Sequence, residues 1–337
     1  MWFALLRKNL LFLVLAGSAL AGCASFPEAP AALSVPTFSD DAVIARDGYK
    51  LHITSWHAEA PQAVIIAVHG MNDYAQSFDG PGNWWRDTKG ITVIAYDQRG
   101  FGRNERAGLW PGNDALKSDL RDVVTATHAH YGALPVFIVG HSMGAAVVMS
   151  AAAEETLDVN GVVLAAPAVW GGSELPILYR LSANLAASVA PNKTLTGERA
   201  ARQATDNIDI LRAMIKDPFV IKETTIKSIL GVTRIMWEAQ QSAAKIGGNV
   251  FYLYGAKDEI IPVKSMAKMR ARLCGNIRHE VYDDGWHMVL RDLQAQVVWQ
   301  DVAKWMEENL AVLEHRRPMF GKVGPAAEQC AQDVEVR

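Results

Sequence analysis

The sequence predicts an α/β fold: a mostly parallel, doubly wound sheet with an inserted helical cap. Two patterns carry this prediction. Short runs that are apolar nearly throughout alternate with segments of helical periodicity, as expected of strands that helices cover on both faces. Residues 168–245 then break the alternation, because their pattern is helical and contains no clear buried strand.

The elements follow in order along the chain. Residues 42–46 and 50–56 flank Asp47-Gly48, a dipeptide favoured in two-residue hairpin turns, so the domain is expected to open with an antiparallel pair. Apolar residues recur at helical spacing within 116–127 and again within 293–310. The buried strands are expected at residues 63–68, 91–96, 136–139, 161–165, 249–254 and 278–282.

Composition bounds the organisation of the chain. Its 337 residues are 50% hydrophobic and 20% charged, which suits one large core with an insertion. The formal net charge of -3, without a block rich in Lys and Arg, argues against nucleic acid as a partner. We expect a core at 40–167 and 246–314, a cap at 168–245 that covers the carboxyl edge of the sheet, and a polar tail at 315–337. Nothing in the sequence sets the oligomeric state.

The N-terminus has the pattern of a targeting signal. Arg7-Lys8 precede an apolar stretch, and residues 20–23 (Leu-Ala-Gly-Cys) look like the lipobox of bacterial lipoprotein precursors. Residues 1–22 would then be a signal peptide, and Cys23 the site of lipid attachment. The alternatives are an uncleaved membrane anchor and an ordinary secretory signal. Resemblance to lipoproteins with Ala24 after the cysteine implies the outer membrane of a Gram-negative cell, facing the periplasm.

Residues 23–39, rich in Pro and Ala, are expected to tether the domain to the membrane. The two other cysteines, Cys274 and Cys330, could pair in an oxidising compartment or stay as free thiols.

Residues 140–144 (Gly-His-Ser-Met-Gly) carry the most chemical information. They lie between an apolar strand and an apolar helix, which is where a nucleophile elbow exposes its serine at the sheet edge. Glycines on either side of Ser142 suit so tight a turn. The pattern therefore predicts Ser142 as a nucleophile, against the alternative of a tight turn with an idle serine.

A serine nucleophile needs a base and an acid that orients the base. His287 follows the last predicted strand on a loop at the same sheet edge, which makes it the best placed of the nine histidines. Asp258 follows the preceding strand and comes before His287 in the chain, as this architecture requires. Its rivals for the orienting role are Glu259, Asp283 and Asp284.

Negative charge on a substrate oxygen would need two backbone N–H donors. Met143, directly after Ser142, is expected to supply one, and Met71, in the loop after strand 63–68, the other. No cofactor is expected, since no P-loop occurs and residues 100–105 fail the dinucleotide fingerprint at its last glycine. No metal is expected either, because His128 and His130 would face different sides of one helix.

Together with residues 140–144, five further motifs lie at matching places along residues 40–313: residues 69–71, 97–102 and 217–220, Gly255 with Asp258 and Pro262, and Gly285 with His287. On these residues the chain resembles α/β-hydrolases of the monoacylglycerol lipase and lysophospholipase group, the serine aminopeptidase-like or Hydrolase-4 family. It departs from the family pattern at Gln98, where histidine is common, at Asn104, where serine is frequent, and at Ala145, where a second glycine is usual.

The resemblance implies an α/β-hydrolase fold and a serine ester hydrolase. We expect a lipid-anchored enzyme that cleaves carboxylic esters of monoacylglycerol or lysophospholipid type through an acyl-enzyme. Two alternatives stay open at this point. One is acyl transfer or amide hydrolysis by the same residues, and the other is a noncatalytic lipoprotein that uses the fold as an interaction module.

Overall fold

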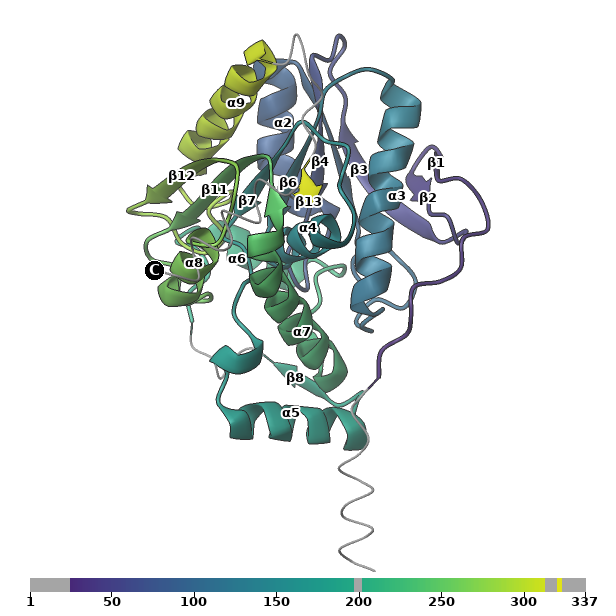
Figure 1. Ribbon diagram of the computed structural model, residues 1–337, viewed down its shortest axis with the longest axis vertical. Coiled ribbons are helices and arrows are strands. Elements are labelled where there is room, and N and C mark those ends of the chain that lie inside the picture. The colour runs from purple at the N-terminus through teal and green to yellow at the C-terminus, as the bar shows by residue number, and fades with distance from the viewer. Residues whose placement is uncertain (1–24, 197–201, 313–319, 323–337) are drawn as a thin grey trace, which may run out of the picture.

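A computed structural model describes residues 25–196, 202–312 and 320–322. Its centre is a nine-stranded sheet in the order β1-β2-β3-β5-β4-β6-β7-β11-β12 (Figure 1). The first three strands pair antiparallel, and the six from β5 to β12 pair parallel. The strands are β1 (Thr37–Phe38), β2 (Ala42–Ile44), β3 (Lys50–Trp56), β4 (Ala63–Val68), β5 (Ile91–Tyr96), β6 (Val136–His141), β7 (Gly161–Ala165), β11 (Asn249–Gly255) and β12 (Asn276–Tyr282).

The predicted mostly parallel, doubly wound sheet is confirmed. The strands expected from apolar runs match the observed ones to within two residues at either end. The opening turn differs from expectation: Ala45 N–H donates to Tyr49 O, so three residues rather than two close it, with Gly48 at φ 81°. Glycine accepts that left-handed conformation without a steric penalty.

Strand β4 shows how the two faces of the sheet are covered. Val64, Ile66 and Val68 belong to one buried cluster, together with apolar residues of α3 (Asn113–Tyr131), α4 (Met143–Glu154) and α8 (Val263–Arg270). Ala63, Ile65 and Ala67 belong to the other, with residues of α2 (Asp79–Lys89) and α9 (Ala295–Val312). Because side chains alternate along a strand, one apolar run serves two cores.

Mainly helical segments lie between β7 and the short strand β10 (Ile246–Gly247), where the sequence predicts the cap. Helix α7 packs along α4, whereas α5 lies at the far end of the molecule (Figure 1). A small antiparallel pair of strands, β8 and β9, was not predicted, because both strands are short and polar and carry no apolar run. The elements are η2 (Gly172–Glu174), α5 (Ile177–Val189), β8 (Thr194–Thr196), α6 (Ile208–Lys216), β9 (Glu223–Thr225), α7 (Ile226–Ser242) and η4 (Ala243–Lys245).

Both terminal segments contribute to the fold. Strand β1 lies inside the segment expected as a tether, and the backbone N–H groups of Leu33 and Ser34 donate to Arg46 O. Near the other end, β13 (Gly321–Lys322) pairs with β10, and Phe320 is buried although it lies in the segment expected as a polar tail. An apolar side chain thus anchors that segment.

Several sequence predictions concern residues outside the described ranges, among them the signal peptide at 1–22, Cys23 and Cys330. Cys274 is disulfide-bonded. Within the described ranges, no helix is both long enough and apolar enough to cross a membrane.

Candidate active site

Ser142 lies between β6 and α4 with φ 52° and ψ -116°, a strained backbone conformation for a residue other than glycine. The flanking glycines make the turn possible. A Cβ on Gly144 would lie 2.1 Å from Val68 O, and one on Gly140 would lie 2.8 Å from the Cα of Ala145. The chain therefore has the backbone of a nucleophile elbow.

The structure brings together the three side chains predicted to cooperate. Ser142 Oγ lies 2.9 Å from His287 Nε2, and His287 Nδ1 lies 2.8 Å from Asp258 Oδ2. All three residues are buried. In the neutral tautomer that fits these contacts, the serine hydroxyl donates to Nε2 and Nδ1–H donates to the carboxylate. This arrangement can draw the proton from Ser142 as its oxygen attacks a carbonyl carbon.

Asp258 is fixed by its backbone surroundings. Its Oδ1 accepts the N–H groups of Ile260 at 2.7 Å and Ile261 at 3.0 Å, which leaves Oδ2 to face the imidazole. Burial would raise the pKa of Asp258, but the hydrogen bonds from His287 and the two backbone amides lower it below its ordinary value. A carboxylate that stays ionised can stabilise an imidazolium beside it.

The rival acids lie elsewhere. Asp284 pairs with Lys257 on the surface, Asp283 is exposed, and Glu259 accepts a backbone N–H from Gln203. Of the four candidate carboxylates, Asp258 is the one in contact with His287.

The two expected oxyanion donors lie on either side of Ser142. Met143 is the first residue of α4, so its N–H has no partner within the helix. A Cβ added to Gly70 would lie 3.3 Å from Ser142 Cβ, so the backbone leading into Met71 passes directly beside the serine. Gly70 O accepts Nδ1–H of the buried His69 at 2.8 Å. Because C=O and N–H of a trans peptide point in opposite directions, this bond helps to set the direction of the Met71 N–H.

His141 has a part that sequence reasoning missed. Its ring points to the loop between β12 and α9 that carries His287 (residues 283–294, called the base loop below), where Nε2–H donates to His287 O at 3.0 Å. Burial, followed by the nearby His287, lowers the pKa of His141 to about 3, so this ring stays neutral. The contact holds the backbone of the candidate base.

Asp292 and Arg291 also brace the base loop and were not predicted. Asp292 accepts Trp286 N–H at 2.7 Å and the hydroxyl of Thr205 at 2.6 Å, and burial raises its pKa. Arg291 forms a 2.6 Å ion pair with Asp73. In the sequence, only their spacing of four or five residues from His287 indicates this role. Residues at the same spacing can equally lie on the surface, so the spacing does not identify them.

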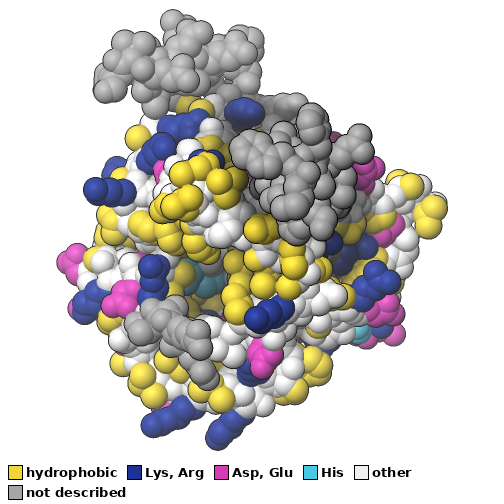
Figure 2. Space-filling model, turned by 90° about the horizontal axis from the view of Figure 1, so that it is seen from below, with side chains coloured by type: hydrophobic (Ala, Val, Ile, Leu, Met, Phe, Trp, Pro, Cys, Tyr) yellow, Lys and Arg dark blue, Asp and Glu magenta, His cyan; other side chains and the backbone are white. Residues whose placement is uncertain are grey.

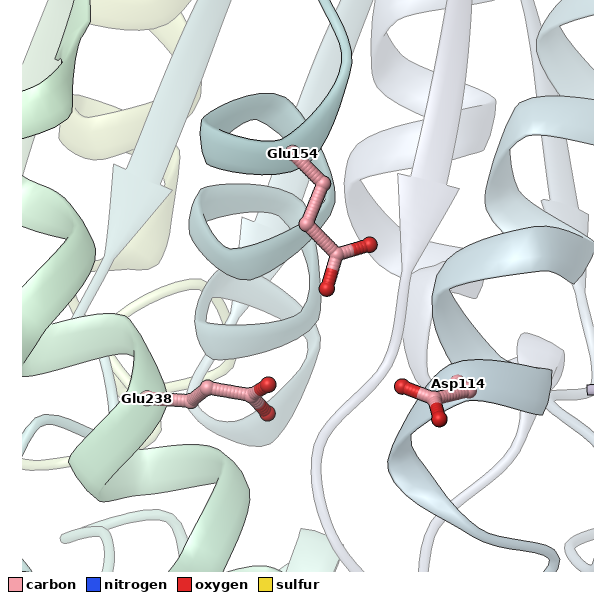
Figure 3. A group of neighbouring side chains, drawn as sticks. All are labelled: Asp114, Glu154 and Glu238. Atoms are coloured by element: carbon pink, nitrogen blue, oxygen red, sulfur yellow. The ribbon is translucent and has the colours of Figure 1, made fainter. Parts of the chain in front are cut away.

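One group of acidic side chains within the described ranges has the spacing of a metal site: Asp114, Glu154 and Glu238 approach one another from α3, α4 and α7 (Figure 3). A lysine supplies the cation there. Lys117 Nζ lies 2.9 Å from Asp114, 3.0 Å from Glu238 and in contact with Glu154, while its side chain is 1% exposed. Burial alone would lower the pKa of Lys117, but its hydrogen bonds to the carboxylates raise it. The group therefore ties helix α7 to the core as an ion cluster.

Comparison with known proteins adds the family. Residues 59–294 match the family model described as serine aminopeptidase, S33. The chain belongs to this family. The matched residues include Ser142, Asp258 and His287 as well as the predicted cap.

Several known proteins are similar to this chain over most of its length. A monoacylglycerol lipase from Mycolicibacterium smegmatis is 24% identical over 81% of this chain and 99% of its own. Human monoglyceride lipase is 24% identical over 82% of this chain and 93% of its own. Among solved structures, Paleococcus ferrophilus monoacylglycerol lipase superposes with a TM-score of 0.65 at 19% identity, over 77% of this chain and 99% of its own. The last comparison shows a shared fold.

Two departures from the family pattern are structural braces. Gln98 donates its side-chain amide to His69 O at 2.7 Å, and its backbone N–H to His69 Nε2 at 2.9 Å. Asn104 donates to Asp97 O at 2.6 Å and accepts the N–H of His52. Both side chains are buried and bind backbone groups. Gln98 thus supports the loop that carries Met71, and Asn104 holds the backbone of residues 97 and 98 beside it.

Proposed function

We propose that this chain is a serine hydrolase that cleaves carboxylic esters of monoacyl lipids through an acyl-enzyme. The observation that carries the proposal is the continuous hydrogen-bond series from Ser142 Oγ through His287 to Asp258, at 2.9 and 2.8 Å. The family and its relatives named monoacylglycerol or monoglyceride lipase support the substrate class.

In the proposed reaction, Ser142 Oγ attacks the ester carbon while its proton moves to His287 Nε2. The carbonyl π electrons move onto oxygen, where the N–H groups of Met71 and Met143 stabilise the negative charge. When the tetrahedral intermediate collapses, the C–O bond to the alcohol breaks and the imidazolium returns its proton to the leaving oxygen. Water then repeats the sequence on the acyl-enzyme. The anionic Asp258 stabilises the imidazolium in both halves of the reaction.

We also propose that a lipid on Cys23 tethers the enzyme to the periplasmic face of an outer membrane. The described chain begins beside the cap, where the Phe26 ring lies 4.7 Å from the Arg234 guanidinium and 5.6 Å from Lys227 Nζ, both on α7. Residue 23 is three residues away, so an extended chain puts it within about 10 Å of Phe26.

The surface at this end of the molecule suits a bilayer. Helix α5 exposes apolar side chains, with Leu178 76% and Val189 77% exposed, and hydrophobic side chains gather there in Figure 2. Exposed apolar area of this kind marks interaction surfaces. A radiolabelled fatty acid supplied to the cells should label the wild type and leave a Cys23→Ser variant unlabelled. If the variant is labelled equally, Cys23 does not carry the lipid.

Ser142→Ala tests the catalytic proposal. The wild type should hydrolyse a monoacylglycerol and react with a fluorophosphonate probe, whereas the variant should lose both reactions at an unchanged melting temperature. Ester hydrolysis that survives the substitution contradicts the mechanism. An amino-acid p-nitroanilide cleaved faster than the monoacylglycerol would favour the amidase alternative.

A further inference from the structure

Residues 69–74, called the oxyanion loop below, make contacts with other segments of the chain at positions 72, 73 and 74. Just after Met71, Asn72 and Tyr74 reach into the cap, while Asp73 reaches Arg291 on the base loop. The loop that carries a proposed oxyanion donor therefore has two separate partners. Its cap partner lies within residues 217–224, which include the Asp-Pro-Phe-Val motif that the proposed chemistry leaves without a role.

Asn72 makes the closest connection to the cap. Its Nδ2 donates to Thr224 Oγ1 at 2.6 Å, and its own carbonyl accepts Ile221 N–H at 2.9 Å. Its backbone is left-handed, with φ 65°, a conformation that asparagine tolerates better than most residues. The cap thus holds both the side chain and the main chain of the residue that follows Met71.

Tyr74 makes a second connection two residues later. Its hydroxyl donates to Asp217 Oδ2 at 2.7 Å, and its ring lies 5.7 Å from that of Phe219. The other oxygen of Asp217 accepts Phe219 N–H at 2.9 Å, which shapes the turn through the motif. The Asp-Pro-Phe-Val motif is therefore part of the contact between the cap and the oxyanion loop.

We propose that Asn72 is a positioning residue through which the seated cap sets the direction of the Met71 N–H. The inference rests on the ester hydrolysis proposed above. The oxygen of the Gly70–Met71 peptide accepts the His69 ring at 2.8 Å and Asp73 N–H at 3.4 Å, and on its other side the peptide adjoins Asn72, which the cap holds. When the cap segment separates from the loop, Asn72 loses the two bonds that hold its strained conformation, and the amide beside it is free to turn.

This arrangement affects the chemical step more than substrate binding. Negative charge on the substrate oxygen develops in the transition state and is absent from the ground state, so a misaligned N–H donor costs transition-state stabilisation and leaves ground-state binding largely intact. Loss of one oxyanion donor lowers kcat by about 10²- to 10³-fold in serine hydrolases. Loosening a donor that stays in place should cost less, about 10-fold.

Thr224→Val is the decisive variant, because it removes the hydroxyl that binds Asn72 and keeps the size of the side chain. We expect kcat for a short p-nitrophenyl ester to fall about 10-fold with KM changed less than two-fold. Affinity for a trifluoromethyl ketone, whose hemiketal oxyanion occupies the same site, should weaken by the same factor. Thr224→Ser keeps the hydroxyl and should restore both values. Thr196→Val, on the exposed partner strand β8, is the matched control and should behave as wild type.

Asn72→Gly tests the same bond from the other side. Glycine accepts φ 65° and cannot donate to Thr224, so the variant should lose activity to the same extent as Thr224→Val. The double variant should lose no more than either single one, because both remove the same interaction.

The outcomes separate this proposal from the one it rests on. If the wild type neither hydrolyses esters nor reacts with a fluorophosphonate, ester hydrolysis itself fails. If the wild type does both, and Thr224→Val matches Thr196→Val or Thr224→Ser fails to rescue, the role of Asn72 is refuted. A loss that appears in KM with kcat unchanged also refutes it, as does a loss in the double variant equal to the product of the two single losses.

Discussion

Replacement of Asp258 by asparagine keeps the shape of the site and removes one negative charge. Oδ1 accepts two backbone N–H groups, from Ile260 and Ile261, so the side-chain oxygen of asparagine should stay there and its NH₂ should face His287. In the opposite orientation the NH₂ group would face these two N–H groups. Two buried donors would then lack an acceptor, at a cost of about 1–3 kcal/mol each.

An NH₂ group beside Nδ1 can only donate, so the imidazole must carry its proton on Nε2 instead. Nε2 then donates to Ser142 and cannot accept its proton. The wrong tautomer lowers kcat by roughly 10³- to 10⁴-fold, equivalent to about 4–5.5 kcal/mol of transition-state stabilisation. The melting temperature should change little, because the packing and the two backbone bonds remain.

The assay compares kcat for a p-nitrophenyl ester, the rate of fluorophosphonate labelling and thermal melting in Asp258→Asn and Asp284→Asn. Asp284 pairs with Lys257 on the surface, so its variant should keep kcat within two-fold of wild type. Asp258→Asn that retains more than about a tenth of wild-type kcat while folded would refute the tautomer argument.

Three further predictions concern His141, Lys117 and Gly144. Burial lowers the pKa of His141 from 6.5 to about 3, so its contribution to stability is complete above pH 6.5 and decreases as pH falls toward 3. Between pH 7 and pH 4.5 the unfolding free energy of the wild type should therefore fall by about 2–3 kcal/mol more than that of His141→Gln. Equal falls for the two proteins in urea titrations would contradict this. Lys117→Met leaves three carboxylates within 4.8 Å of one another, so it should lose about 1–3 kcal/mol of unfolding free energy. The variant should also show a rise in Tm with Ca²⁺ that the wild type lacks. A Tm that does not change with Ca²⁺ would count against Lys117 as the counter-ion of these carboxylates. A Cβ at Gly144 would lie 2.1 Å from a backbone oxygen, so Gly144→Ala should not yield folded protein. Gly132→Ala, at φ 64° with open space around it, should cost about 1 kcal/mol of unfolding free energy. Soluble yield and circular dichroism compare the two variants, and a folded Gly144→Ala would show that the elbow can relax.

The sequence predicted those parts of the site that depend on a local pattern and one rule of topology. Strand β6 has an apolar run, the elbow has its glycines, and parallel strands end at one edge, which brings Ser142, Asp258 and His287 to the same side. The choice among the acids also followed a topological rule, since Asp258 leaves the strand before the histidine loop. These predictions needed no knowledge of side-chain packing.

What the sequence could not predict depends on contacts between distant segments. The antiparallel strands β8 and β9 are short, polar and 26 residues apart, so no apolar periodicity marks them. Phe320 follows Met319 in a mostly polar stretch, and only the fold shows that it is buried. The bond between Asn72 and Thr224 joins residues 152 positions apart, and neither residue type is unusual for a loop. No rule of spacing connects such pairs.

The contacts made by residues 72–74 show why the cap cannot be treated as a passive cover. Asn72 and Tyr74 of the oxyanion loop are hydrogen-bonded to the cap, and Asp73 forms an ion pair with Arg291 of the base loop. Two elements that must act together, the base and the oxyanion donor, are therefore linked through one three-residue segment. Since preorganised donors account for much of the rate in such enzymes, the position of the cap bears on chemistry as well as on access. Cap substitutions that touch this segment should change kcat, and those on the far side of α5 should not.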